Sequence, residues 1–199
     1  MIDTRRFDWL AIVLYLAIAL FGWVNIYAAC YDEMHAEVLD FTRQHGKQLI
    51  WMGIGFLLAI FVLLIEPRFF SQTAYLIYGV VLILLVVTLF IGTVTKGGQS
   101  WIDFGSFKFQ PSEFAKLATA LAVAKAVSAI DIDYSRWRTR LMLGALVLVP
   151  AGLILLQHDT GSALVFAAFL IPFFREGLPH EIFLYGRLAV ALFIAALLV

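Results

Sequence analysis

The sequence predicts an all-α fold, a polytopic bundle of transmembrane helices that forms a single membrane domain over residues 1–199. Two observations carry this prediction. Hydrophobic residues make up 63% of the 199 residues and charged residues only 14%, which leaves too little polar surface for a soluble domain of this size. Apolar runs that approach the ~30 Å width of the hydrocarbon core of a bilayer recur along the whole chain.

Seven apolar runs are expected to be the membrane spans. They cover residues 9–29, 49–65, 73–91, 114–130, 141–156, 160–174 and 182–199. The first run is longer than the apolar core of a secretory signal, which favours a span over a cleaved leader. Nine of the 14 lysines and arginines, among them Arg5 and Arg6, fall on one side if the N-terminus is inside. The positive-inside bias therefore predicts a cytoplasmic N-terminus and places segments 31–48, 92–110 and 157–160 outside.

The fourth, fifth and sixth runs have features of their own. Small residues occupy one face of the fourth run, at Ala115, Ala118, Ala122 and Ala126. Such a face lets helices approach closely in lipid, so this helix is expected to be central in the bundle. Pro150 is expected to interrupt the fifth run. The strictly apolar core of the sixth, 163–173, is short for a full span at ~1.5 Å per residue, and broken helices in membranes usually line a cavity.

Segment 92–110 contains a polar, aromatic and glycine-punctuated loop between two apolar runs. Aromatic residues flank Gly105-Ser106, a pairing suited to a tight II′ hairpin turn. Trp101, beside the apolar face of this hairpin, suits the headgroup layer of a membrane. The hairpin is interpreted either as an interfacial anchor or as a plate that contacts a lipid-linked substrate, and these residues alone favour the anchor.

Charged residues lead from this loop directly into the fourth run. Pro111 suits the first turn of a helix, where its missing N–H costs nothing, and Glu113 then lies near the positive helix end. Lys116 is three residues further on, so the two charged side chains share a face and can pair. The pattern fits a capped helix with a snorkelling lysine. It fits equally well a buried ion pair aimed at a cavity that holds a carboxylate, a sugar hydroxyl or a phosphate.

A second polar stretch, Gln157 to Ser162, lies between the fifth and sixth runs on the predicted outer side. Asp159 suits an N-cap of the sixth helix. The same side chain is also a candidate acid, base or metal ligand that faces an outer cavity together with Glu113. No phosphate-binding glycine loop, cysteine and histidine metal cluster or Ser-His-Asp order occurs in the sequence.

The predicted inner loop, 130–140, carries three arginines that alternate with other residues: Arg136, Arg138 and Arg140. Arginines just inside a span meet anionic lipid headgroups favourably, so this loop is expected to anchor the chain at the membrane surface.

Three stretches resemble the SEDS family (shape, elongation, division and sporulation), and the resemblance covers essentially the whole chain. They are Trp101-Ile102 with Gly105, the string Gln110-Pro111-Ser112-Glu113-Phe114-Ala115-Lys116-Leu117, and the string Asp159-Thr160-Gly161-Ser162-Ala163-Leu164-Val165-Phe166. The residues Asn25-Ile26-Tyr27-Ala28-Ala29 and the short N-terminus are more similar to the RodA-like branch of the family than to the FtsW-like branch.

The resemblance implies a multi-pass peptidoglycan glycosyltransferase of the bacterial cytoplasmic (inner) membrane that serves cell elongation and rod shape. Members polymerise lipid II, an undecaprenyl-pyrophosphate disaccharide-peptide, into glycan strands at the outer membrane face. The attacking sugar hydroxyl needs a base and the leaving pyrophosphate needs positive charge. Lipid II, a class B penicillin-binding protein and other membrane proteins of the elongation complex are the implied partners, and no nucleic acid is expected.

The resemblance also implies roles for individual residues. The expected catalytic residues are Asp159, Glu113 and Lys116. The two acids would serve the attacking hydroxyl, and the lysine, together with a divalent cation such as Mg²⁺ or Mn²⁺, would serve the pyrophosphate. The residues expected to bind substrate are Trp101, Lys108, Gln110 and Ser112. No residue is assigned as a ligand of a resident metal.

Two features depart from the family pattern. Gln99 lies where many members carry a basic residue, which removes one candidate phosphate contact. The sequence ends at Val199 within an apolar run, whereas family members continue into further spans and a large outer loop with an essential aspartate. The chain is therefore expected to be the N-terminal half of such a protein and not to polymerise lipid II alone. A transporter (flippase) of a lipid-linked precursor and a non-catalytic scaffold for a transpeptidase remain alternative functions.

Overall fold

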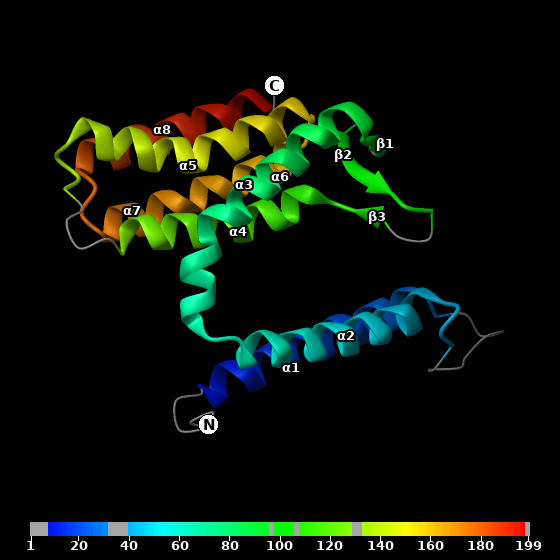
Figure 1. The fold of residues 1–199 in the computed structure, drawn as a ribbon. Coiled ribbons are helices and arrows are strands. Elements are labelled where there is room, and N and C mark those ends of the chain that lie inside the picture. Colours follow the sequence, from blue (N-terminus) through cyan, green and yellow to red (C-terminus); the bar gives the residue numbers. More distant parts are fainter. Residues whose placement is uncertain (1–7, 32–39, 96–97, 106–107, 129–132, 198–199) are drawn as a thin grey trace. The chain divides into compact units, whose positions relative to one another are not determined.

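The structure is a computed structural model that describes residues 8–31, 40–95, 98–105, 108–128 and 133–197. The chain divides into two compact units, Met1–Glu66 and Pro67–Val199, whose helices and strands are labelled in Figure 1. Several positions used in the predictions lie outside the described residues: Arg5, Arg6, the turn residue Ser106, and residues 129–130 and 198–199 of two predicted spans.

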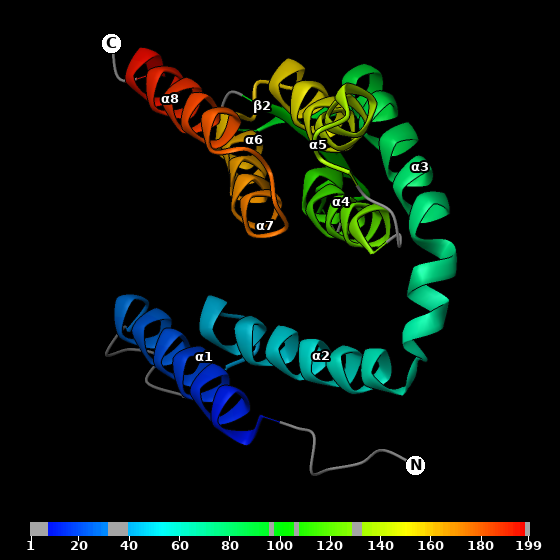
Figure 2. The ribbon, with the colours of Figure 1, turned by 90° about the vertical axis from the view of Figure 1, so that its left-hand side faces the viewer.

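The first unit holds two long apolar helices, α1 (Trp9–Ala29) and α2 (Gln44–Leu64), which pack against each other (Figure 2). Aromatic contacts join the end of α1 to the start of α2. Trp23 Nε1 donates a hydrogen bond to the carbonyl of His45 at 3.0 Å, and the ring of Tyr27 meets the His45 imidazole edge-on with 5.2 Å between centroids. These residues therefore have a packing role within this unit.

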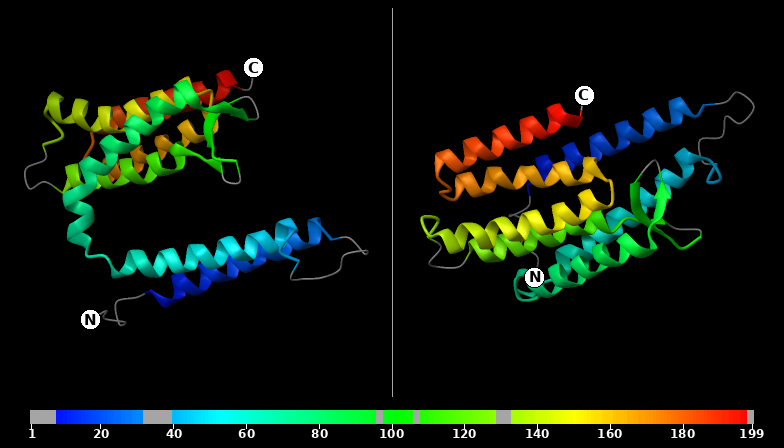
Figure 3. Two further views of the ribbon diagram at one scale, coloured as in Figure 1. Left: turned by 45° about the vertical axis from the view of Figure 1, so that its right-hand side comes forward. Right: turned by 90° about the horizontal axis from the view of Figure 1, so that it is seen from above.

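In the second unit, α4 (Pro111–Val127) packs against both α3 (Pro67–Ile91) and α5 (Trp137–Leu156). Figure 3 shows α4 and α5 alongside each other. The predicted alanine face is buried, with no more than 3% of any of its residues exposed: Ala115, Ala118, Ala122 and Ala126. Leu85 of α3 and Ile154 of α5 lie in the same core with no exposed surface. The prediction of a central, closely packed fourth helix is confirmed.

The fifth helix continues through Pro150, so the predicted interruption is wrong. A proline inside a helix leaves the carbonyl four residues earlier without its usual N–H donor. Here that carbonyl belongs to Leu146, and it accepts a hydrogen bond from the hydroxyl of Tyr78 on α3 at 3.0 Å. A neighbouring helix thus supplies the missing donor, which is the usual way a membrane helix tolerates proline.

The sixth predicted span is broken, as its short apolar core indicated. It consists of α6 (Thr160–Val165), the 3-10 helix η3 (Phe166–Phe169) and α7 (Leu170–Arg175), and α8 (His180–Leu197) follows. A cavity of about 600 Å³ is lined almost entirely by apolar side chains of α5, this broken segment and α8. In this unit the broken segment therefore lines a cavity, as predicted.

Between α3 and α4 the chain forms a small antiparallel sheet of β1 (Thr93–Thr95), β2 (Gly98–Asp103) and β3 (Lys108–Phe109) in that order. The pairs between β2 and β3 are Ile102 with Phe109 and Asp103 with Lys108, which is the register of the predicted hairpin. Gly105 has a φ of 82°, a conformation that favours glycine. The turn type stays a prediction, because Ser106 lies outside the described residues.

Strand β1 was not predicted, and it makes the loop a three-stranded sheet within an otherwise helical fold. It pairs Thr93 with Trp101 of β2. Gly92 lies at the junction with α3, where a Cβ atom would come within 2.5 Å of the Thr88 carbonyl and 2.8 Å of the Gln99 carbonyl. Only glycine therefore lets the chain turn this closely from the helix into the sheet.

Among the helices that the structure describes, four are long and apolar enough to cross a membrane: α1, α2, α3 and α5. The protein is thus a helical membrane protein with several spans. The other three predicted spans coincide with α4, the broken segment and α8, which are not among those four. The count of seven spans and the cytoplasmic N-terminus stay predictions.

Candidate functional site

The sheet, the start of α4 and the turn between α5 and α6 meet at one end of the second unit (Figure 1). The backbone N–H of Gln99 in β2 donates to the carbonyl of Gln157, just after α5, at 2.9 Å. The ring of Phe109 in β3 lies 4.8 Å, centroid to centroid, from that of Phe114 in α4. The fold therefore brings together the three stretches of sequence that contain the predicted site residues.

The carboxylate of Asp159 accepts hydrogen bonds from two different elements. Its Oδ1 accepts from the backbone N–H of Ser162 at 3.0 Å, so the predicted N-cap of α6 is confirmed. Its Oδ2 accepts from Nε2 of Gln110, which immediately precedes α4, also at 3.0 Å. These two donors together fix the orientation of a half-buried carboxylate relative to the start of α4.

One turn further along α4, Glu113 and Lys116 form a direct ion pair, with 2.6 Å between Lys116 Nζ and Glu113 Oε2. The predicted pairing is therefore present. The Glu113 side chain is 54% exposed and that of Lys116 is 28% exposed, so the pair lies at the surface of the described chain. An ion pair in such a position contributes little to stability, but both charged groups remain accessible to a ligand.

The remaining predicted substrate-binding residues fall into two kinds. Trp101 is half-buried in β2, while Lys108 is exposed in β3 with its ammonium 3.8 Å from the Asp103 carboxylate. Ser112, by contrast, is fully buried, and its hydroxyl has no hydrogen-bond partner among the described residues. Substrate binding by these residues stays a prediction; Trp101 and Lys108 are accessible for it, whereas Ser112 has no exposed surface.

A divalent cation would need oxygen ligands at this site. In the part of the chain that the structure describes, no group of three or more His, Cys, Asp or Glu side chains could hold a metal ion. Both oxygens of Asp159 already accept hydrogen bonds, and Glu113 is paired with Lys116. Among the described residues these carboxylates do not by themselves make a metal site, and the expected divalent cation stays a prediction.

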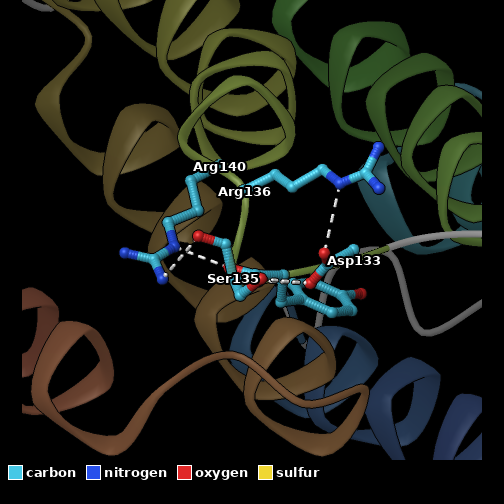
Figure 4. A network of polar contacts seen from close by, with 5 residues as sticks. Asp133, Ser135, Arg136 and Arg140 are labelled. Atoms are coloured by element: carbon cyan, nitrogen blue, oxygen red, sulfur yellow. Dashed lines mark hydrogen bonds and ion pairs between the residues drawn. The ribbon is translucent and has the colours of Figure 1, made fainter.

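A second polar cluster lies at the opposite end of α5, in residues 133–140 (Figure 4). The Asp133 carboxylate accepts hydrogen bonds from the hydroxyl and the backbone N–H of Ser135 and from Nε of Arg136. These donors, the Ser135 hydroxyl first among them, hold the pKa of Asp133 below its usual value. Arg140 donates to the carbonyl of Tyr134 at 2.6 Å and to that of Ser135 at 3.1 Å. Arg140 thus folds back onto its own loop, and lipid contact by these arginines stays a prediction.

One buried residue of the site end, Gln157, received no role from the sequence. It has no exposed surface, and its side-chain Nε2 donates to the carbonyl of Leu85 in α3 at 2.9 Å. The sequence did offer one signal, because Gln157 is an amide placed directly after a long apolar run. Its burial gives that position meaning, since a buried polar residue is more informative than an exposed one.

Comparison with known proteins gives one family for nearly the whole chain. Residues 8–199 match the family model of the cell cycle proteins FtsW, RodA and SpoVE. The peptidoglycan glycosyltransferase RodA of Treponema pallidum is 32% identical over 178 residues, which are 87% of this chain and 39% of that protein. The peptidoglycan glycosyltransferase MrdB of Escherichia coli is 32% identical over 196 residues, 98% of this chain and 50% of that protein. The chain thus spans about half the length of the curated relatives it matches.

Solved structures give the same result. The crystal structure of the rod shape determining protein RodA of Thermus thermophilus matches with a TM-score of 0.82 at 33% identity, over 96% of this chain and 61% of that one. A chain from a peptidoglycan synthase complex, described for its coordination of polymerization and crosslinking, matches with a TM-score of 0.78 at 35% identity. That match covers 96% of this chain and 54% of the other.

Proposed function

This chain belongs to the FtsW, RodA and SpoVE family of cell cycle proteins, and from this premise we propose that it forms part of a peptidoglycan glycosyltransferase. The substrate is lipid II, which the enzyme polymerises into glycan strands at the outer face of the bacterial cytoplasmic membrane. Several relatives carry the name of this activity, and the contribution of this chain is the cluster of polar residues at the sheet end of its second unit.

The observation that carries the proposal is the hydrogen bond between Gln110 and Asp159, one helical turn from the Glu113–Lys116 pair. Two carboxylates and an ammonium group are thereby grouped around the start of α4. In the reaction, the 4-hydroxyl oxygen of one sugar bonds to the anomeric carbon of another as the bond to the lipid pyrophosphate breaks. A carboxylate takes the hydroxyl proton, and the pyrophosphate leaves with the bonding electrons.

The residues divide these tasks by their charge. Asp159 and Glu113 are the acceptors for the hydroxyl proton, and the hydrogen bonds to Asp159 hold its carboxylate in place before the substrate arrives. Lys116 supplies positive charge for the leaving pyrophosphate, because a charged donor placed where negative charge develops stabilises the transition state. The accessible Trp101 and Lys108 of the sheet would hold the sugar and the lipid-linked phosphates.

The test is polymerisation of lipid II by purified protein, as the 199-residue chain and as the longest reading frame that contains it. Each is assayed with and without a class B penicillin-binding protein, a partner supported by the match to a peptidoglycan synthase complex. The proposal would be supported if at least one of these preparations makes glycan strands and its Asp159→Asn variant does not. Absence of strands from every preparation, in an assay where a relative is active, would refute it.

A second candidate function is movement of a lipid-linked precursor across the membrane. The observation in its favour is the broken segment α6–η3–α7 beside a cavity of about 600 Å³, because transporters use discontinuous helices at their binding sites. Inward-to-outward movement of labelled lipid II in vesicles, without polymer, would favour this function. A scaffold for a transpeptidase would be favoured if neither activity is found and Glu113, Lys116 and Asp159 can all be replaced.

A further inference from the structure

Gln157 is a polar residue in a place where an apolar one would cost less. It has no exposed surface and directly follows α5. Burying an amide is unfavourable unless its groups are hydrogen-bonded. The Gln157 Nε2 donates to the Leu85 carbonyl at 2.9 Å, but Oε1 has no hydrogen-bond partner among the described residues. The fold therefore buries an amide whose oxygen has no described partner. This unfavourable burial must be offset by another effect of Gln157.

The contacts of Gln157 join three elements. Its side chain reaches α3 through the Leu85 carbonyl, 72 positions earlier in the chain. Its backbone carbonyl accepts from the Gln99 N–H of β2 at 2.9 Å. Its own N–H donates to the carbonyls of Leu153 and Ile154 in the last turn of α5. One residue thus fixes the end of α5 to both the sheet and α3.

The turn that follows transmits this position to Asp159. His158 has a φ of 60°, which is uncommon for a residue other than glycine, and its N–H donates to the Leu155 carbonyl at 2.9 Å. The Asp159 N–H donates to the Ile154 carbonyl at 3.3 Å. Each residue of the turn is therefore held by a backbone hydrogen bond, so the place of Gln157 decides where the Asp159 carboxylate meets Gln110.

We infer that Gln157 is a positioning residue, which holds the Asp159 carboxylate against Gln110 by fixing the α5–α6 turn to α3 and β2. This inference deepens the proposed function and rests on it for its effect on activity. Gln157 does not contact substrate, because it is fully buried. Without its amide, the turn keeps its hydrogen bonds to α5 but loses its tie to α3.

The test uses Gln157→Met in the complete enzyme, because methionine matches glutamine in length and lacks the amide. The matched control is Ile154→Val, a fully buried residue in the last turn of α5 whose apolar side chain makes no hydrogen bond. Displacement of a catalytic group by ~1 Å can cost about 100-fold in rate, so we expect kcat to fall about tenfold or more in Gln157→Met. KM should stay within about twofold, and Ile154→Val should keep its kcat within about twofold at a similar melting temperature.

Hydrogen exchange gives a readout that does not depend on activity. The Ser162 N–H is bonded by Asp159 and the Gln99 N–H by Gln157, so both should exchange faster in Gln157→Met and not in Ile154→Val. Unchanged exchange at both amides, or an equal loss of kcat in the control, would overturn the inference. If Gln157→Met does not fold, Gln157→Asn replaces it, since its shorter amide cannot reach Leu85. If the unsubstituted protein makes no glycan and Gln157→Met still exchanges these amides faster, the proposed function is refuted and the positioning role stands.

Discussion

Two aspartates at opposite ends of α5 show how differently polar clusters are built in this protein. Among the described residues, Asp133 takes its donors from Ser135 and Arg136, within three residues of itself. Asp159 takes one donor from Ser162 and the other from Gln110, 49 positions earlier. A local cluster can form without tertiary packing, because its donors and acceptor lie in one short segment of the chain. A long-range cluster forms only when separate helices have packed, because the packing must first offset the entropy of bringing them together.

This difference separates a cluster that shapes a loop from one that can hold a reacting group. The Asp133 cluster stabilises the chain where it enters α5 (Figure 4). The Asp159 cluster depends on α4, on the α5–α6 turn and, through Gln157, on α3 and β2. A carboxylate held by several packed elements stays in one orientation, which is what catalysis by a positioned group requires.

The strongest way to break the comparison is to remove each carboxylate in turn. In the complete enzyme, Asp159→Ala should lower lipid II polymerisation about 100-fold or more, the range of general acid–base catalysis. Asp133→Ala should leave the rate within about twofold, because the hydrogen bonds described for its carboxylate lie within its own loop. Asp159→Asn separates catalysis from capping, since it keeps an acceptor for the Ser162 N–H and should still lose activity. If Asp159→Ala and Asp133→Ala lose the same polymerisation activity, the two clusters do not differ in function.

A second test compares two ion pairs of the same i,i+3 spacing, Glu113–Lys116 and Asp133–Arg136. Lys116→Ala should lower the polymerisation rate about 10- to 100-fold, because one group that stabilises developing negative charge is lost. Arg136→Ala should leave the rate unchanged. Both should change the melting temperature little, as is usual for ion pairs at the surface. A Lys116→Ala enzyme with full activity would exclude a role for this ammonium group.

A third test concerns stability at the Asp133 end. Arg140→Met should lower the free energy of unfolding by about 1–2 kcal/mol, because the carbonyls of Tyr134 and Ser135 lose a charged donor. Activity at saturating substrate should hardly change. Thermal unfolding in detergent measures the loss, and Arg140→Lys, which keeps the charge without the planar fork, should recover only part of it. A fully stable Arg140→Met protein would show that these bonds do not shape the loop.

The smallest expected effect is a dependence on pH. The folded-state pKa of Asp133 is lowered by its donors, so its contribution to stability is present above the usual aspartate pKa of about 3.9 and is lost as the pH falls through the lower folded value. The melting temperature should therefore fall more between pH 5 and strong acid, about pH 2, in the parent protein than in Asp133→Asn. Parallel curves for the two proteins would mean that the carboxylate is not held in this way.

Much of the fold and part of the site could be predicted because the relevant signals are short-range. The buried alanines of α4 follow from a helical repeat, and the hairpin register follows from aromatic residues around Gly105. The cap at Asp159 and the pairing of Glu113 with Lys116 each involve residues three positions apart. Patterns of this kind depend on the geometry of one helix or one turn, which a single sequence contains.

Other features depend on which elements pack together. Pro150 indicated a break, and the helix continues because the Tyr78 hydroxyl on another helix supplies a donor for the Leu146 carbonyl. Strand β1 forms because Gly92 allows the chain to turn closely against Gln99. The continuity of α5 through Pro150 could not be read from nearby residues, because the donor to the Leu146 carbonyl lies 68 positions earlier.

The sequence by itself determined that this is a helical membrane protein of a recognisable family, and it determined which polar residues are candidates for chemistry. Only the tertiary structure decided that Gln110 bonds to Asp159, that Ser112 is buried, and that Gln157 joins α3, β2 and α5. The reason is physical: hydropathy and local hydrogen bonding act over a few residues, whereas these contacts exist only once distant helices have packed around the same core.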